Sequence, residues 1–104
     1  MGSPLVSVVM SVYNGQQYLH PSLDSLLAQD GVDFEIVVVD DGSVDRSPEI
    51  LEDYARRDPR VRVIRQENAG ITRALARGCT EAKGELIARQ DDDDVSMPGR
   101  LSKL

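Results

Sequence analysis

Four apolar segments rich in β-branched residues alternate with three segments of helical periodicity, and this alternation restricts the fold more than any other feature. The apolar segments cover residues 5–12, 34–40, 61–64 and 85–90. Their nearly continuous hydrophobicity is typical of strands buried on both faces of a parallel sheet. Strands that alternate with helices through right-handed crossovers form a doubly wound α/β sheet. The sequence therefore predicts a single domain over residues 1–104, with βαβαβαβ order and a mostly parallel sheet.

Each helical segment shows one apolar face and recognisable ends. The first helix is predicted to begin near His20, because Pro21 fits only the first turn of a helix. In the second, Ser47 is a candidate N-cap and Pro48 suits the first helical position. The third is predicted to end at Gly84. The predicted buried faces comprise Leu19, Leu23, Leu26 and Leu27; then Ile50, Leu51, Tyr54 and Ala55; and finally Ile71, Leu75, Cys79 and Ala82.

Composition excludes several classes of protein. Hydrophobic residues make up 40% of the 104 residues, which is enough for a folded core. The net charge of −6 argues against binding to DNA or RNA through the phosphate backbone. Cys79 is the single cysteine, so no internal disulfide can form, and we expect it to be a small buried residue. No apolar run approaches the roughly 20 residues of a membrane span, so a cytoplasmic location is expected.

Polar residues follow each predicted strand, where a doubly wound sheet binds its ligands. After the first strand, Ser11 offers a hydroxyl, Tyr13 an aromatic face and Asn14 an amide, although an ordinary turn would use the same residues. After the second strand come two adjacent carboxylates, Asp40 and Asp41, which serve either as turn residues or as acceptors for a nucleotide base or ribose.

The ends of the third and fourth strands suggest anion and cation binding. Asn68 and Gly70 form a predicted turn into a helix whose backbone N–H groups would face an anion. The fourth strand is followed by four aspartates at residues 91–94, here called the acidic loop. Adjacent carboxylates repel one another unless a cation or a proton relieves them. Mg²⁺ or Mn²⁺ would suit these oxygen ligands, and a solvated acidic turn is the alternative.

Three stretches, VSVVMSVYNGQQYLHPSLDSLLAQ, FEIVVVDDGSVDRSPEIL and NAGITRALARGCTEAKGELIARQDDDDVSMPGRL, resemble the successive motifs of family 2 glycosyltransferases with the Rossmann-like GT-A fold. The resemblance covers nearly the whole chain in the right order and spacing. It implies transfer of a sugar from a nucleotide-sugar donor, usually a UDP-sugar, to an acceptor with inversion. Possible acceptors are a polysaccharide, a lipid carrier or a protein, in a cytoplasmic enzyme that can also work at the inner membrane face during cell-envelope polysaccharide synthesis.

The resemblance also assigns site residues by position. Tyr13 would stack near the base, with Ser11 and Asn14 lining the nucleotide pocket. Asp41 would bind uracil. The DXD motif of the family falls on residues 91–93, so that Asp92 would lie near the ribose. Asp91 and Asp93 would hold Mg²⁺ or Mn²⁺ at the diphosphate.

Two departures and one absence qualify this assignment. Ser11 replaces a frequent proline of the family, and Leu75 and Ala76 stand where many members have Arg-Asn. The general base of an inverting transfer is a carboxylate that takes the proton of the acceptor hydroxyl. In the family this base and the acceptor site follow the metal motif, so both are expected beyond Leu104. The chain is therefore expected to be a donor-binding half that is inactive by itself.

Two other nucleotide or phosphate proteins share this type of sheet. A receiver-like signalling domain needs a phosphorylatable aspartate after its third strand, and residues 61–68 contain none. A nucleotidyltransferase usually carries a Gly- and Arg-rich loop after the first strand, which differs from SVYNGQQY at residues 11–18. The nucleotidyltransferase-like or non-catalytic nucleotide-binding domain remains the alternative to the sugar transferase.

Overall fold

The strands form one parallel sheet in the order β3-β2-β1-β4. The computed structural model describes residues 4–104. Its elements follow the chain as β1 (Val6–Val12), α1 (Leu19–Leu27), β2 (Phe34–Asp40), α2 (Ser47–Arg57), β3 (Val61–Arg65), α3 (Ile71–Glu81), β4 (Leu86–Arg89) and the short 3₁₀-helix η1 (Leu101–Lys103). The chain runs outward from β1 to β3 and then crosses to β4 on the other side of β1. The predicted doubly wound α/β fold is confirmed.

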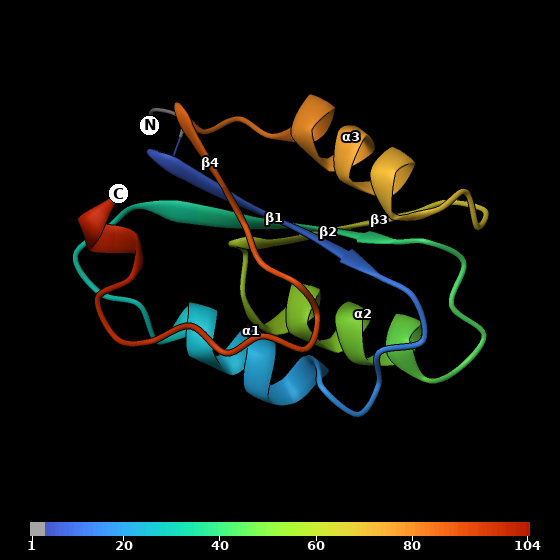
Figure 1. Cartoon of the computed structure of the whole chain (residues 1–104). Coiled ribbons are helices and arrows are strands. Elements are labelled where there is room, and N and C mark those ends of the chain that lie inside the picture. The colour runs from blue at the N-terminus through green and yellow to red at the C-terminus, as the bar shows by residue number, and fades with distance from the viewer. Residues whose placement is uncertain (1–3) are drawn as a thin grey trace.

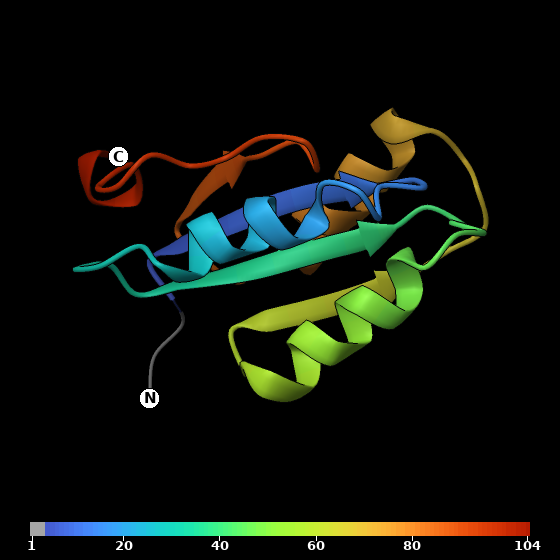
Figure 2. The same cartoon turned by 90° about the horizontal axis from the view of Figure 1, so that it is seen from below.

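The helices cover both faces of the sheet. Figure 1 shows α3 on one face and α1 with α2 on the other, and Figure 2 shows α1 and α2 from their own side. Side chains alternate between the two faces along a strand, so every second residue of β1 and β2 points toward α1 and α2. The main core is aliphatic, and its fully buried members include Val8, Met10, Leu19, Leu23, Leu26, Ile36, Val38 and Leu51.

The predicted apolar faces of α1 and α2 are confirmed, but that of α3 is wrong. The buried residues of α3 are Ala74 and Gly78, whereas Ile71 and Cys79 are exposed. A Cβ on Gly78 would lie 2.5 Å from Cγ1 of Val9, so the helix approaches the sheet closely. Small residues permit this approach, while Leu75 and Ala82 of the predicted face are only half-buried.

Two predicted helix ends also differ from the structure. Ser47 is the first residue of α2 rather than its cap, and its Oγ accepts a hydrogen bond from the N–H of Gly15 at 3.0 Å. Helix α3 ends at Glu81, before Gly84. A Cβ on Gly84 would lie 2.6 Å from the backbone nitrogen of Ser7, so this glycine allows two chain segments to touch. Within residues 4–104, no helix combines the length and the hydropathy that crossing a bilayer demands.

A buried carboxylate ties the α3–β4 connection to the sheet. Glu35 of β2 accepts hydrogen bonds from Ser7 Oγ at 2.6 Å, Lys83 N at 2.7 Å and Arg62 Nη1 at 2.9 Å. Ser7 Oγ in turn accepts from the N–H of Gly84 at 2.8 Å. Burial alone would raise the pKa of Glu35, but the hydrogen bonds outweigh it and hold the pKa below its ordinary value.

Strand β4 departs from the predicted burial on both faces. Leu86 and Ile87 are 42% and 52% exposed, and Ala88 is its buried residue. The strand pairs with β1 on one side and occupies the edge of the sheet. Its apolar side chains are therefore less covered than those of β1 and β2.

Candidate functional site

The predicted functional segments meet at the edge of the sheet where the parallel strands end. The N–H of Asn14, after β1, donates to Ser43 Oγ, after β2, at 2.9 Å. Gly15 lies against the acidic loop, because a Cβ at this position would come within 2.4 Å of Asp92 Oδ2. Three strand ends are thus in contact around Gly15 and Asn14.

Ser11 and Tyr13 occupy the end of β1 and the start of its loop. Ser11 is half-buried and lies beside Val39 of β2. Val12 belongs to the core between the sheet and helices α1 and α2. Since side chains alternate along a strand, the adjacent Ser11 faces the side covered by α3. Tyr13 is 52% exposed, which leaves its aromatic surface open to a stacking partner.

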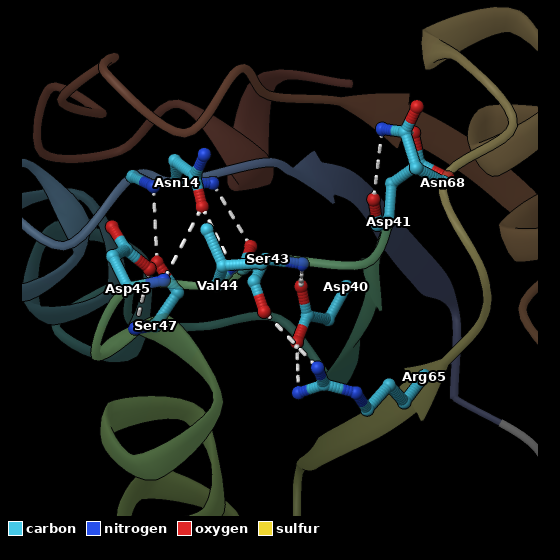
Figure 3. A network of polar contacts seen from close by, with 10 residues as sticks. Asn14, Asp40, Asp41, Ser43, Val44, Asp45, Ser47, Arg65 and Asn68 are labelled. Atoms are coloured by element: carbon cyan, nitrogen blue, oxygen red, sulfur yellow. Dashed lines mark hydrogen bonds and ion pairs between the residues drawn. The ribbon is translucent and has the colours of Figure 1, made fainter.

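Asn14 connects the loops that follow β1 and β2 (Figure 3). Its φ of 53° lies in the left-handed region, which asparagine tolerates better than most residues. Its Oδ1 accepts hydrogen bonds from the N–H groups of Val44, at 2.9 Å, and Asp45, at 3.4 Å. The side-chain oxygen is therefore engaged in the fold, and a contact with a ligand would fall to Nδ2.

Asp40 and Asp41 have separate roles although they are adjacent. Asp40 is 1% exposed, and its Oδ1 accepts from the N–H of Ser43 at 3.0 Å. Its Oδ2 pairs with Arg65 Nη1 at 3.2 Å, as Figure 3 shows. Asp40 thus stabilises the turn after β2 and ties that turn to the end of β3.

The Asp41 carboxylate organises the loop that follows β3. Oδ1 accepts hydrogen bonds from Gln66 Nε2 at 2.8 Å and from the N–H of Ala69 at 2.9 Å. Oδ2 accepts from the N–H of Gly70 at 2.9 Å and from Asn68 Nδ2 at 3.2 Å. Burial would raise the pKa of Asp41, but the bonds from Gln66, Ala69 and Gly70 hold it below its ordinary value.

This arrangement changes the interpretation of the turn at the start of α3. The backbone N–H groups near Gly70 were expected to face a bound anion. The anion that they face in the structure is the Asp41 side chain. A carboxylate has about four lone-pair sites, and the contacts with residues 66–70 already number four. A base that hydrogen-bonds to Asp41 must share or displace one of these donors.

A hollow of about 510 Å³ lies beside this loop. It is lined by Gly42, Arg65, Gln66, Glu67 and Asn68. The lining combines backbone with polar side chains from the ends of β2 and β3. The hollow therefore lies next to Asp41, one of the predicted base-binding residues.

The acidic loop brings three of its four carboxylates together. One oxygen from each of Asp91, Asp93 and Asp94 lies within 4.8 Å of the others. Asp91 also pairs with Arg89 at 3.0 Å on the surface. Asp92 points elsewhere, toward Gly15, and its pKa is raised, first by burial and then by the charges of Asp93, Asp91 and Asp94.

These residues fit a hard divalent cation. A set of carboxylate oxygens is the donor type that Mg²⁺ and Mn²⁺ prefer. A bound cation would also relieve the repulsion among like charges in the loop. Asp91 and Asp93 are the predicted ligands, and the structure adds Asp94, which the sequence motif had left without a role.

The sequence does not predict the buried polar side chains that contact the acidic loop. Gln90 directly follows β4 and is 2% exposed, and it contacts Ser22, Ser96 and Arg100. The available signal was a glutamine at the end of the apolar segment 85–90. Its partners are not evident from the sequence, because Ser22 is separated from Gln90 by 68 positions.

The family of the chain follows from its sequence. The family described as "Glycosyl transferase family 2" matches residues 7–104. The chain belongs to glycosyltransferase family 2. This membership confirms the resemblance drawn from the motifs, and it favours a sugar transferase over the receiver-like and nucleotidyltransferase alternatives.

Two bacterial proteins with glycosyltransferase names are similar to the chain in sequence. The chain is 47% identical over 101 residues to the uncharacterized glycosyltransferase EpsJ of Bacillus subtilis, covering 97% of this chain and 29% of EpsJ. It is 44% identical over 103 residues to the glycosyltransferase GlyG of Streptococcus pneumoniae, covering 98% of this chain and 34% of GlyG. The chain thus spans about a third of these relatives.

Two solved structures with bound nucleotide sugars share the fold. Staphylococcus aureus TarS 1-349 in complex with UDP-GlcNAc superposes with a TM-score of 0.88 at 31% identity, covering 95% of this chain and 29% of TarS. The mannosyltransferase PcManGT of Pyrobaculum calidifontis, in complex with GDP-Man and Mn²⁺, superposes with a TM-score of 0.81 at 28% identity. That match covers 89% of this chain and 28% of PcManGT. The GT-A type of fold is therefore confirmed.

Proposed function

We propose that this chain binds the nucleotide diphosphate of a sugar donor, and that the protein transfers the sugar to an acceptor with inversion. The observation that carries the proposal is the acidic cluster of Asp91, Asp93 and Asp94, which lies at the same sheet edge as the exposed ring of Tyr13. An aromatic surface and a cation site at one edge suit the two ends of such a nucleotide. Similar structures bound to UDP-GlcNAc and to GDP-Man support the assignment.

The base end of the nucleotide would lie near β1 and β2. Tyr13 would stack on the base, Ser11 would line the pocket, and Asn14 would contact the nucleotide through Nδ2. Asp41 would accept a hydrogen bond from uracil, in exchange for one donor from residues 66–70. The adjacent hollow of about 510 Å³ provides room for the ring or for the displaced side chain. UDP is the donor nucleotide that this assignment favours.

The diphosphate end would lie at the acidic loop. Asp91 and Asp93 would hold Mg²⁺ or Mn²⁺, with Asp94 in reach of the same position. Asp92 lies against Gly15, closer to the loop after β1, where it would contact the ribose. When bound, the metal supplies positive charge that stabilises the leaving diphosphate.

The acceptor and the general base are not assigned to residues of this chain. Inversion requires a carboxylate that removes the proton of the acceptor hydroxyl. At this sheet edge, Asp40 and Asp41 are bonded within the fold, residues 91–94 form the acidic loop, and Glu67 is exposed beside the hollow. The chain also spans only about a third of the relatives that it matches. We therefore propose that residues outside this chain complete the acceptor site, and that the chain alone binds the donor nucleotide without transferring sugar.

Calorimetric titration with UDP tests this function. We expect the chain to bind UDP more tightly with Mn²⁺ or Mg²⁺ than with a chelator, and Asp93→Asn to lose the gain that metal provides. Asp30→Asn is the control, because Asp30 is also exposed but precedes β2 at the opposite edge of the sheet. A parallel titration with GDP tests the base preference. Identical UDP affinity with metal, with chelator and in Asp93→Asn would refute the proposed metal-dependent site.

A further inference from the structure

Gln90 is a buried amide between the end of β4 and the acidic loop. It is 2% exposed, and its N–H bonds to the carbonyl oxygen of Val9 on β1 at 3.2 Å. Its side-chain Nε2 donates toward Ser22 Oγ at 2.8 Å, the Ser22 carbonyl at 3.2 Å and the Asp94 carbonyl at 3.2 Å. One amide group thus connects the last aspartate of the loop to helix α1.

The side-chain oxygen of Gln90 binds residues that follow the acidic loop. Gln90 Oε1 accepts from Arg100 Nη1 at 3.0 Å and from the hydroxyl of Ser96. Arg100 Nη2 also donates to the carbonyl of Arg89 at 2.8 Å. The segments that enter and leave the acidic loop are therefore fastened to each other through Gln90 and Arg100.

Helix α1 contributes two serine hydroxyls to this network. Ser25 Oγ accepts from the N–H of Ser96 at 2.8 Å, and Ser22 Oγ lies 3.5 Å from the carbonyl of Asp91. Ser22 is fully buried and Ser96 is nearly so. Buried polar groups of this kind are costly unless they are bonded, so their mutual satisfaction favours a single arrangement of the backbone.

We propose that Gln90 is a positioning residue for a divalent cation at the acidic loop. Like charges in the loop repel one another, and a free loop would relieve that repulsion by spreading. Gln90 bonds to the carbonyl of Asp94, and Ser22 and Ser25 of α1 bond to the backbone on either side of the loop. Together these bonds hold the backbone so that three carboxylate oxygens converge. Gln90 touches no cation itself. The inference rests on the proposed function, because it requires that the loop bind metal.

Mn²⁺ binding, measured by the electron paramagnetic resonance of free Mn²⁺ in the presence of UDP, tests the proposal. Gln90→Met keeps the length of the side chain and removes its polar atoms. We expect it to weaken Mn²⁺ binding about tenfold or more, as is typical for residues that orient metal ligands. Thermal unfolding of each variant shows whether it is folded at the temperature of the titration.

Gln29→Met is the matched control. Gln29 is also a buried glutamine, 5% exposed, and its amide holds Met97 and Leu101 rather than the acidic loop. We expect this variant to lose stability but to keep the Mn²⁺ affinity of the wild type. If both variants lose affinity equally, the effect is a general loosening of the segment, and the specific role of Gln90 is overturned.

Ser22→Ala is a second variant with a smaller structural cost, because alanine is favourable within a helix. It removes the hydroxyl that receives Gln90 Nε2, so Mn²⁺ binding should weaken in the same direction even if Gln90→Met does not fold. Wild-type Mn²⁺ affinity in every folded variant at Gln90 and Ser22 overturns the proposal and leaves the proposed function standing. Absence of Mn²⁺ binding by the wild-type chain removes the proposed function, and the inference with it.

Discussion

Gly15 leaves room for the carboxylate of Asp92, because a Cβ on Gly15 would come within 2.4 Å of Asp92 Oδ2. Gly15→Ala should therefore displace this carboxylate. The atom in conflict is the end of a flexible side chain, so we expect the free energy of unfolding to change by no more than about 1 kcal/mol. UDP binding in the presence of Mn²⁺ should weaken if Asp92 contacts the ribose. Calorimetric titration, paired with urea denaturation, measures both effects.

Gly84→Ala is the contrasting control for this prediction. A Cβ on Gly84 would meet the backbone nitrogen of Ser7 at 2.6 Å, and backbone cannot move aside as a side chain can. We expect a loss of about 1–3 kcal/mol in stability, with UDP affinity unchanged in the folded protein, because Gly84 precedes β4 at the other end of the sheet. If Gly15→Ala binds UDP and Mn²⁺ as the wild type does, Asp92 has no part in the site.

Asn14 stabilises the contact between the loops after β1 and β2 through its side-chain oxygen. Asn14→Ala removes the acceptor for the N–H groups of Val44 and Asp45 and keeps a left-handed backbone that alanine disfavours. We expect a loss of about 1–2 kcal/mol in the free energy of unfolding. Asn14→Asp retains an oxygen at the same place and should recover most of the stability. Equal losses in the two variants would contradict a role for that oxygen.

The sheet and the edge that carries the candidate site could be predicted from the sequence because both depend on local patterns. Parallel strands end at one edge, so residues as distant as Tyr13 and Asp93 were assigned to one site by their positions after strands alone. The faces of α1 and α2 were also predicted, since leucine periodicity marks a buried stripe. The buried face of α3 was missed because Ala74 and Gly78 pack through small size, which a search for large apolar residues overlooks.

The contacts of the site could not be predicted because each depends on the distance between separate segments. Asp41 could be assigned to the edge, but its bonds to residues 66–70 depend on how the loop after β3 turns back. The place of Ser47 before Pro48 predicts a helix cap, whereas in the structure its hydroxyl accepts a hydrogen bond from the N–H of Gly15. The partners of Gln90 likewise come from α1 and from the chain after the acidic loop.

Asp41→Asn should loosen the loop that follows β3. The substitution leaves one oxygen for the donors of Gln66, Ala69 and Gly70 and places an amide N–H₂ opposite another donor. We expect a loss of about 2–3 kcal/mol in stability, since bonds to a charged carboxylate are stronger than neutral ones and leaving donors unpaired is costly. Amide hydrogen exchange at Ala69 and Gly70 should accelerate in the variant.

The same loop reports on base binding in the wild type. If uracil donates a hydrogen bond to Asp41, the amide resonances of Ala69 and Gly70 should shift on titration with UDP, because one of the present donors must be shared or displaced. Asp40→Asn provides the comparison, since it disturbs the neighbouring carboxylate but leaves residues 66–70 bonded to Asp41. Unchanged resonances of Ala69 and Gly70 at saturating UDP would place the base elsewhere.

The buried Glu35 carboxylate predicts how stability depends on pH. Hydrogen bonds hold its pKa below the ordinary value, so the folded protein binds a proton there less readily than the unfolded chain does. The stabilisation is therefore complete above the ordinary glutamate pKa of about 4.3. It is lost as pH falls through the lower pKa of the folded state. Glu35→Gln should lose about 2 kcal/mol at pH 7, because it weakens the bonds to Ser7, Lys83 and Arg62.

The comparison of Glu35→Gln with the wild type at several pH values separates this charge from the other acids. Below the lowered pKa of folded Glu35 the wild-type side chain is neutral as well. The difference in unfolding free energy between the two proteins should therefore stay constant from pH 7 to about pH 4.3 and shrink as pH falls further toward 3. Glu52→Gln is the control, because Glu52 is exposed on α2 and its substitution should leave stability nearly unchanged at each pH. If the difference between Glu35→Gln and the wild type stays constant over the whole range from pH 7 to 3, the negative charge of Glu35 does not contribute to the free energy of unfolding.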